Sequence, residues 1–181
     1  MDPSTDPIPA PLAAAHAFDA ARAAFLAAFA QVPDAALSYL PEGDEYALGG
    51  LLMHLGNPLP RYTVLLARLI EARAAGVNPW SEDEEQSYRA LREEAQAARP
   101  TEADRARLLN LLDSAHAQFR ARLVAFPPER FDLEVPVLYP HNPEPSPTSA
   151  HAVAGWMIDH YQDHTTQVQA MLANWLEQHP T

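Results

Sequence analysis

The chain has 181 residues, no cysteine and a formal net charge of −12, with 24 acidic side chains against 12 basic ones. The lack of cysteine excludes disulfides, thiolate metal ligands and cysteine nucleophiles. The acidic balance argues against a nucleic-acid partner, which needs clustered Lys and Arg, and less strongly against an acidic membrane surface; solubility is its simplest explanation.

The length suits a single domain with a sizeable core, and a composition with 48% hydrophobic residues and only 6 glycines favours helices. The N-terminal sequence MDPSTDPIPAP lacks the basic start and apolar run of a signal peptide. No uninterrupted apolar run reaches the roughly 20 residues of a membrane-spanning helix. We therefore expect a soluble, cytoplasmic protein without a membrane partner.

Residues 1–10 are expected to form a flexible arm, and residues 11–176 a single helical domain. Pro11 suits the first turn of a helix that runs to about Gln31, with phenylalanines along its apolar side. Val32-Pro33 ends this helix.

A second helix is expected to start after Gly43, with Asp44 as its N-cap, and to carry the sequence DEYALGGLLMHLGN. Gly49 and Gly50 weaken this helix but would let a neighbouring backbone come close. Pro58 and Pro60 then interrupt the pattern, and the helical period resumes to near residue 76. This spacing predicts one long helix that is kinked or broken just after His54.

Two start signals follow. Ser81 with Glu84 forms a capping box and predicts a short exposed helix to about residue 98. Thr101 with Asp104 opens a longer helix to about residue 125, whose apolar residues recur three and four apart, as in helical bundles.

Residues 131–139 alternate between apolar and polar side chains, which indicates a short strand or an extended segment that Pro136 confines to a sheet edge. The proline-rich residues 141–149 are expected to form a loop, with Thr148 or Ser149 capping a last helix. The prediction is an all-α chain with four main helices in a bundle.

The last helix has one continuous apolar stripe with two histidines at its centre. Burying two imidazoles costs free energy unless each finds a partner, and one metal ion can serve both. His160 and His164 lie one turn apart and point the same way. The alternative is a pair of core histidines that bond to carbonyls or carboxylates. The stripe consists of Val153, Met157, His160, His164, Val168, Met171 and Trp175.

His54 is the natural third ligand, because it lies on the apolar side of another helix where that helix is interrupted. The alternative is a core histidine satisfied by hydrogen bonds. Three histidines from two helices would form a nitrogen-rich site with open positions for water or substrate. Zinc, nickel or another divalent ion suits such ligands, and the sequence does not choose among them.

Three further side chains lie near this pair on the last helix. Gln167 could bond a metal-bound water or bridge to a neighbouring helix. Asp159 and Asp163 could orient an imidazole, or simply form a solvated face. No residue stands out as a general base apart from a metal-bound water, so the sequence identifies no catalytic residue.

The other histidines are weaker candidates. His16 and His116 lie among alanines and are expected to be exposed or half-buried. His141, in the proline-rich segment, could overhang the site. His151 is more than two turns from His160, too far to share an ion with it on one helix.

Glu45-Tyr-Ala-Leu48 leading into Leu51-Leu-Met-His-Leu55, with His160-x-x-x-His164-x-x-Gln167 over a hundred residues later, resembles the DinB/YfiT-like metalloenzyme family. The resemblance covers most of the chain. It implies an up-and-down-type four-helix bundle with a long crossover, often a homodimer. It also implies that His54, His160 and His164 bind a divalent metal, commonly zinc or nickel.

Some members of that family are S-transferases or isomerases that use a low-molecular-weight thiol, and others are described as metal-dependent hydrolases. We therefore expect a metal-dependent enzyme of hydrolase or thiol S-transferase type acting on a small molecule. The alternative is a non-catalytic, metal- or small-molecule-binding, stress-related dimer. A third possibility is a plain helical bundle without metal.

Overall fold

The computed structural model describes residues 8–72, 76–140 and 142–180, so most of the expected N-terminal arm and His141 lie outside the described residues. The described chain is mostly helical with one small two-stranded sheet, which confirms the helical class in its broad form. The single-domain assignment stays a prediction. In chain order the elements are α1 (Ala10–Phe29), η1 (Asp34–Ala36), α2 (Gly50–Gly56), α3 (Pro58–Glu71), α4 (Glu82–Ala97), α5 (Glu102–Val124), η2 (Pro128–Arg130), β1 (Val135–Val137), β2 (Ser146–Thr148) and α6 (Ala150–Gln178).

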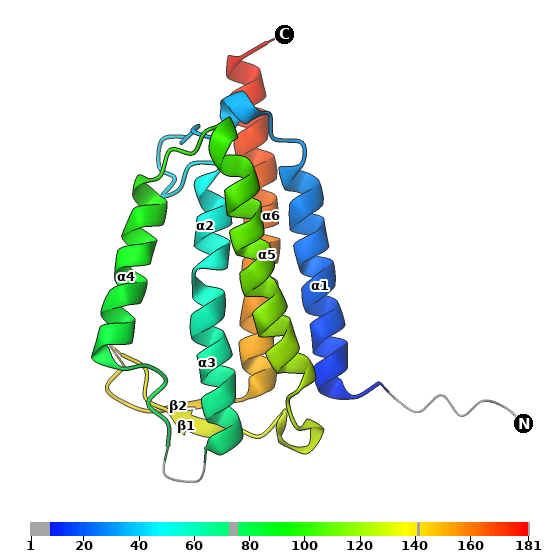
Figure 1. The fold of residues 1–181 in the computed structure, drawn as a ribbon, viewed down its shortest axis with the longest axis vertical. Coiled ribbons are helices and arrows are strands. Elements are labelled where there is room, and N and C mark those ends of the chain that lie inside the picture. The colour runs from blue at the N-terminus through cyan, green and yellow to red at the C-terminus, as the bar shows by residue number, and fades with distance from the viewer. Residues whose placement is uncertain (1–7, 73–75, 141, 181) are drawn as a thin grey trace, which may run out of the picture.

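The long helices run side by side along the long axis of the molecule (Figure 1). Helix α6 packs against α1, α2 and α3, and α5 packs against the same three helices, while α4 covers α2 from outside. Their facing apolar side chains form one continuous core. The sheet lies at the end of the molecule where α6 begins.

The predicted break in the second helix is confirmed at Asn57, between α2 and α3. Pro58 cannot donate a backbone hydrogen bond to the carbonyl of His54, four residues earlier, and its ring crowds that carbonyl. The Asn57 side chain donates to the Leu91 carbonyl at 3.0 Å, which ties the break to α4. His54 is therefore in the last turn of a short helix rather than in the middle of a long one.

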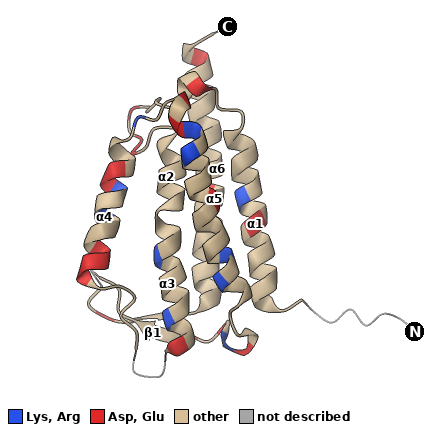
Figure 2. Ribbon diagram, viewed as in Figure 1, with Lys and Arg blue, Asp and Glu red and all other residues tan. Residues whose placement is uncertain are grey.

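The predicted caps of the last three helices are confirmed. The Ser81 hydroxyl accepts from the Glu84 amide at 3.2 Å and the Glu84 carboxylate accepts from the Ser81 amide at 2.6 Å. The Thr101 amide donates to Asp104 at 3.0 Å, and Ser149 caps α6. The acidic first turn of α4 (Figure 2) also places negative charge at the positive end of the helix dipole.

Two local predictions are wrong. Asp44 does not cap the second helix, which begins six residues later at Gly50, because residues 37–49 fold back on themselves instead. The Gly49 amide donates to the Leu37 carbonyl at 2.8 Å, and a Cβ at Gly49 would lie 2.9 Å from Pro100. In addition, residues 146–148 of the expected loop form β2, which pairs antiparallel with β1 so that Pro136 faces Pro147.

Helix α1 is the one helix among the described residues that is long and apolar enough to cross a membrane by length and composition alone. Core helices of soluble proteins pass the same test. Phe18, Phe25 and Phe29 of α1 are buried inside the protein, so its apolar character has a structural use in the core.

His116 was expected to be exposed or half-buried, and that expectation is wrong, since only 5% of it is exposed. Its ring stacks on Phe18 with centroids 4.1 Å apart, and its nitrogens bond to Asp19 at 3.0 Å and to the Tyr161 hydroxyl at 3.2 Å. Asp19 also accepts from Arg120 at 2.7 Å.

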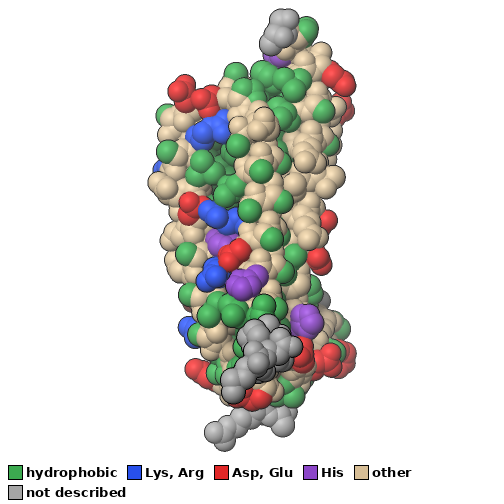
Figure 3. Space-filling model, turned by 90° about the vertical axis from the view of Figure 1, so that its right-hand side faces the viewer, with side chains coloured by type: hydrophobic (Ala, Val, Ile, Leu, Met, Phe, Trp, Pro, Cys, Tyr) green, Lys and Arg blue, Asp and Glu red, His purple; other side chains and the backbone are tan. Residues whose placement is uncertain are grey.

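The face on the side of α1 shows a band of charged and histidine side chains between apolar regions (Figure 3).

We expect Gly49→Ala to destabilise the protein by about 1–3 kcal/mol, because the new methyl group meets Pro100 and the Leu37 carbonyl. The matched control is Gly155→Ala in α6, where a Cβ would meet nothing within 4 Å and helix propensity predicts a gain of up to about 1 kcal/mol. Urea unfolding of the metal-free variants measures both effects. A Gly49→Ala midpoint equal to that of the wild type would contradict the close packing.

Burial lowers the pKa of His116 below its usual value, against an opposing contribution from Asp19. The unfolded chain then binds a proton near pH 6.5 that the folded chain does not, so stability falls as the pH drops below 6.5. We expect His116→Phe to reduce the slope of unfolding free energy between pH 7 and 5 by up to about 1.4 kcal/mol per pH unit. The exposed His16→Gln is the control, and an unchanged slope in His116→Phe would exclude this role.

Candidate metal centre

The last turn of α2 presents His54 toward the middle of α6. Tyr46, in the connection before α2, covers one face of the His54 ring, with centroids 4.1 Å apart and planes 29° apart. Leu51, Leu52 and Leu55 around it are fully buried, so the backbone of this short helix is held by the core. The His54 imidazole is therefore packed against Tyr46 on one side and faces His160 and His164 of α6 on the other.

Helix α6 presents His160 and His164 on the same side, as their spacing predicts. The three rings meet nearly edge to face. The centroid of the His54 ring lies 4.8 Å from that of His160 and 4.6 Å from that of His164, and the centroids of the two α6 rings are 4.7 Å apart. The Nε2 atoms of His54 and His160 are only 2.9 Å apart. One ligand atom from each of the three residues lies within 4.8 Å of the others.

Burial keeps these imidazoles uncharged. It lowers the pKa of His54 to about 3, with the two neighbouring histidines adding to the effect. It also lowers the pKa of His160 to about 4, and it lowers the pKa of His164, although the hydrogen bond that His164 donates to Gln167 opposes that change. At neutral pH all three rings are therefore neutral, and the neutral imidazole is the form that binds metals.

Gln167 orients the third ring. Its side-chain oxygen lies 2.6 Å from His164 Nδ1, and its amide nitrogen donates to Asp44 at 2.7 Å. This bond fixes the proton on Nδ1 and leaves Nε2 of His164 free, as in metal sites where a second residue sets the tautomer of a ligating histidine. Of the two roles considered for Gln167, the structure shows the bridge, directed to the loop before α2.

The donor set fits a divalent cation of the transition series. Two nitrogens bound to one zinc ion at about 2.1 Å each lie about 3.4 Å apart in tetrahedral geometry. Nε2 of His54 and Nε2 of His160 are closer than this, at 2.9 Å, and the ligand atoms of the three residues lie within 4.8 Å of one another. Small rotations of the rings would therefore bring all three nitrogens to one ion. Three neutral nitrogens without a carboxylate suit zinc or nickel better than calcium or magnesium.

A cleft of about 360 Å³ opens beside this cluster. His54 and His160 border it, and the other lining residues come from α3, α4 and α6, so four helices, counting α2 with His54, enclose it. A molecule in this cleft would reach two of the three imidazoles. The lining residues are His54, Pro58, Tyr62, Tyr88, Trp156, Met157, Asp159, His160 and Asp163.

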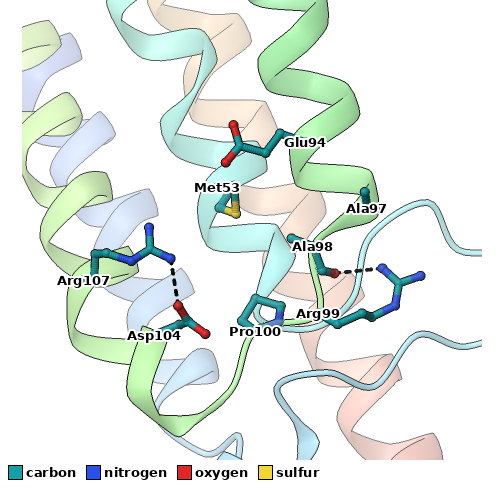
Figure 4. Close-up of a pocket in the computed structure, with 8 residues that line it drawn as sticks. All are labelled: Met53, Glu94, Ala97, Ala98, Arg99, Pro100, Asp104 and Arg107. Carbon is teal, nitrogen blue, oxygen red and sulfur yellow. Dashed lines mark hydrogen bonds and ion pairs between the residues drawn. The ribbon is translucent and has the colours of Figure 1, made fainter.

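A second hollow of similar volume lies between α2, α4 and the start of α5 (Figure 4). Met53 borders it, but no histidine does. Arg107 pairs with Asp104 at 2.8 Å and Arg99 donates to the Ala98 carbonyl at 2.8 Å, so local groups satisfy its two arginines. The cleft beside the three imidazoles is therefore the better candidate for a reactive site.

The remaining described histidines lie away from the cluster. His151 bonds to Asp132 at 2.7 Å, and His16 is exposed. His116 belongs to the separate buried group with Asp19. Asp159 and Asp163 are exposed, as a solvated face predicts, yet both border the cleft.

The family model of the DinB superfamily matches residues 17–168, most of the chain. The chain belongs to the DinB superfamily. The matched stretch contains His54, His160, His164 and Gln167, so the resemblance stated from these motifs is confirmed at the family level. Comparison with curated proteins and with solved structures gives no match. The role of the three histidines as ligands stays a prediction.

Two residues of this DinB-superfamily site were not identified from the sequence. Tyr46 lay within the family-like motif without an assigned role, and Asp44 was taken for a helix cap. The bond between Asp44 and Gln167 joins positions 123 residues apart, and no local pattern signals it. The stacking of Tyr46 on His54 depends on the fold-back of residues 37–49, which no local sequence pattern predicts either.

We expect Gln167→Leu to weaken zinc binding by about 10–100-fold, because His164 loses the partner that fixes its tautomer. Competition with a fluorescent zinc chelator measures the affinity. Gln169→Leu, at an exposed position on the same helix, is the control and is expected to bind zinc like the wild type. Equal affinity of the two variants would show that Gln167 has no part in the site.

Proposed function

We propose that this DinB-superfamily chain is a metal-dependent enzyme that holds a divalent ion, zinc or nickel, on His54, His160 and His164. The observation that carries the proposal is the convergence of three neutral imidazoles from α2 and α6, with ligand atoms within 4.8 Å, at the edge of an open cleft. Such a set leaves coordination positions for water or substrate.

The bound ion would supply a Lewis acid and lower the pKa of a coordinated water or thiol. The protein contributes the rest. Gln167 and Asp44 hold the His164 ring, and Tyr46 restricts the His54 ring. The cleft admits a small molecule from the side where His54 and His160 are accessible.

The reaction is either hydrolysis of a small electrophile or transfer of a low-molecular-weight thiol to it. Both need an activated nucleophile next to the ion and a wall that positions the electrophile. The cleft supplies such a wall through Tyr62, Tyr88 and Trp156. We assign no side chain as general base, because the three imidazoles are occupied with the ion in this proposal.

The proposal includes the architecture implied by the family: an up-and-down four-helix bundle with a long crossover, within a single domain of residues 11–176. Helices α1, α2–α3, α5 and α6 would be its members, and α4 part of a crossover. We further propose a homodimer in the cytoplasm that binds neither nucleic acid nor membrane; its charge of −12 supports the exclusion of nucleic acid.

We expect untagged protein supplied with zinc or nickel to contain about one ion per chain, and His160→Ala to contain none. The metal-free variant should remain folded, because the substitution relieves the cost of burying an imidazole along with losing its packing. Elemental analysis and thermal unfolding measure the two effects, with His16→Ala as the exposed control. Wild-type protein without stoichiometric metal would exclude the metal site.

An enzyme also needs an exchangeable position on the ion, whereas a non-catalytic metal-binding module has a closed shell. We expect the visible spectrum of cobalt-substituted protein to change on titration with azide or cyanide, which displaces a coordinated water. A spectrum unaffected by both anions would favour the non-catalytic alternative.

A further inference from the structure

The cleft beside the histidine cluster has two kinds of lining besides the imidazoles. Aromatic rings form its walls: Tyr62 from α3, Tyr88 from α4 and Trp156 from α6. The exposed carboxylates of Asp159 and Asp163, one turn apart on α6, border it as well. A ligand in the cleft would therefore meet ring faces and negative charge together.

The ring surfaces are available to a ligand. Trp156 is 39% exposed, an unusual state for a side chain of this size. The centroids of the Trp156 and Tyr62 rings are 6.1 Å apart and their planes form an angle of 66°, so the two rings form a corner rather than a closed stack. Such corners of tryptophan and tyrosine are the sites at which proteins bind quaternary and protonated amines.

The same aromatic group already accepts one cation. The guanidinium carbon of Arg61 lies 3.5 Å from the centre of the Trp80 ring and 4.4 Å from that of Tyr88. Trp80 in turn meets Tyr62 at 5.8 Å. Arg61 therefore takes up ring faces of Trp80 and Tyr88, whereas no cationic side chain among the described residues lies over Tyr62 or Trp156.

The positive side chains near the cleft are paired. Arg61 forms an ion pair with Glu85, and Arg92 pairs with Glu45 at 3.1 Å. Among the described residues, neither Asp159 nor Asp163 has an ion-pair partner. The charge that the protein itself brings to the cleft is therefore negative, and it also offsets the two positive charges of the ion proposed at the imidazole end, within a protein whose net charge is −12.

We propose that the cleft binds a small organic cation, a quaternary or protonated amine, with its reacting end at His54 and His160. Its charged end would lie against Trp156 and Tyr62, within the field of Asp159 and Asp163. The volume of about 360 Å³ is at the small end for ligand pockets and suits a compact molecule. This inference rests on the proposed function for its orientation, because only a metal at the histidines makes that end reactive.

The test compares choline with 3,3-dimethylbutan-1-ol, a neutral molecule of the same shape, by calorimetric titration of the zinc-loaded full chain. We expect choline to bind at least about fivefold more tightly, since only choline gains from the rings and carboxylates. Equal binding of both probes, or no detectable binding of choline, would overturn the proposal.

Matched variants assign the effect to the cleft. Trp156→Leu, and the double change Asp159→Asn with Asp163→Asn, should each remove most of the preference for choline. Trp175→Leu and Glu177→Gln, on the same helix but outside the lining of the cleft, should keep it. A preference that survives both cleft variants would contradict the assignment.

Zinc content, measured on every sample, separates this proposal from the proposed function. Zinc-loaded protein that shows no preference for choline rejects the cation site and leaves the metal site standing. Protein that binds neither zinc nor nickel rejects the metal-dependent function, and the same titration of the metal-free chain then decides whether the cleft by itself selects a cation.

Discussion

The burial of three uncharged imidazoles between α2 and α6 is the constraint on which the rest of this structure depends. The His164 ring bonds to the side-chain oxygen of Gln167, whereas the Nε2 atoms of His54 and His160 face each other at 2.9 Å instead of a carbonyl or carboxylate. A cation satisfies both lone pairs at once. The helix break at Pro58, the stacked Tyr46 and the bond from Gln167 to Asp44 are all features that hold these rings in place.

The parts of the fold that local chemistry determines could be predicted from the sequence. The capping boxes at Ser81 and Thr101, the interruption at Pro58 and the shared side of His160 and His164 follow from short-range rules. Asp44 and His116 could not be placed this way. Their environments arise from segments far along the chain, Gln167 for one and Asp19 with Tyr161 for the other. Likewise, β2 forms despite Pro147, because pairing with β1, outside its own local sequence, stabilises its extended backbone.

Helix α6 is held by polar groups on two of its sides. One side carries His160 and His164, and the next residue after His160, Tyr161, turns into the buried group formed with His116 and Asp19. Both groups lie within one turn of each other along α6. Because polar bonds are directional, they restrict rotation and sliding of the helix in a way that apolar packing alone does not. The placement of the His160 and His164 rings thus depends also on a second polar group, which lies outside the lining of the cleft.

The fold-back of residues 37–49 has a consequence for how such a site diversifies. Two backbone hydrogen bonds join its two ends to each other, from the Leu48 amide to the Tyr39 carbonyl and from the Gly49 amide to the Leu37 carbonyl. The loop places Tyr46 against the His54 ring and Asp44 against Gln167, the partner of His164. Exchange of this loop between relatives would retune how strongly a metal is held without altering any coordinating side chain. The proposed affinity for an ion could then change during divergence independently of the cleft, whose other lining residues come from α3, α4 and α6.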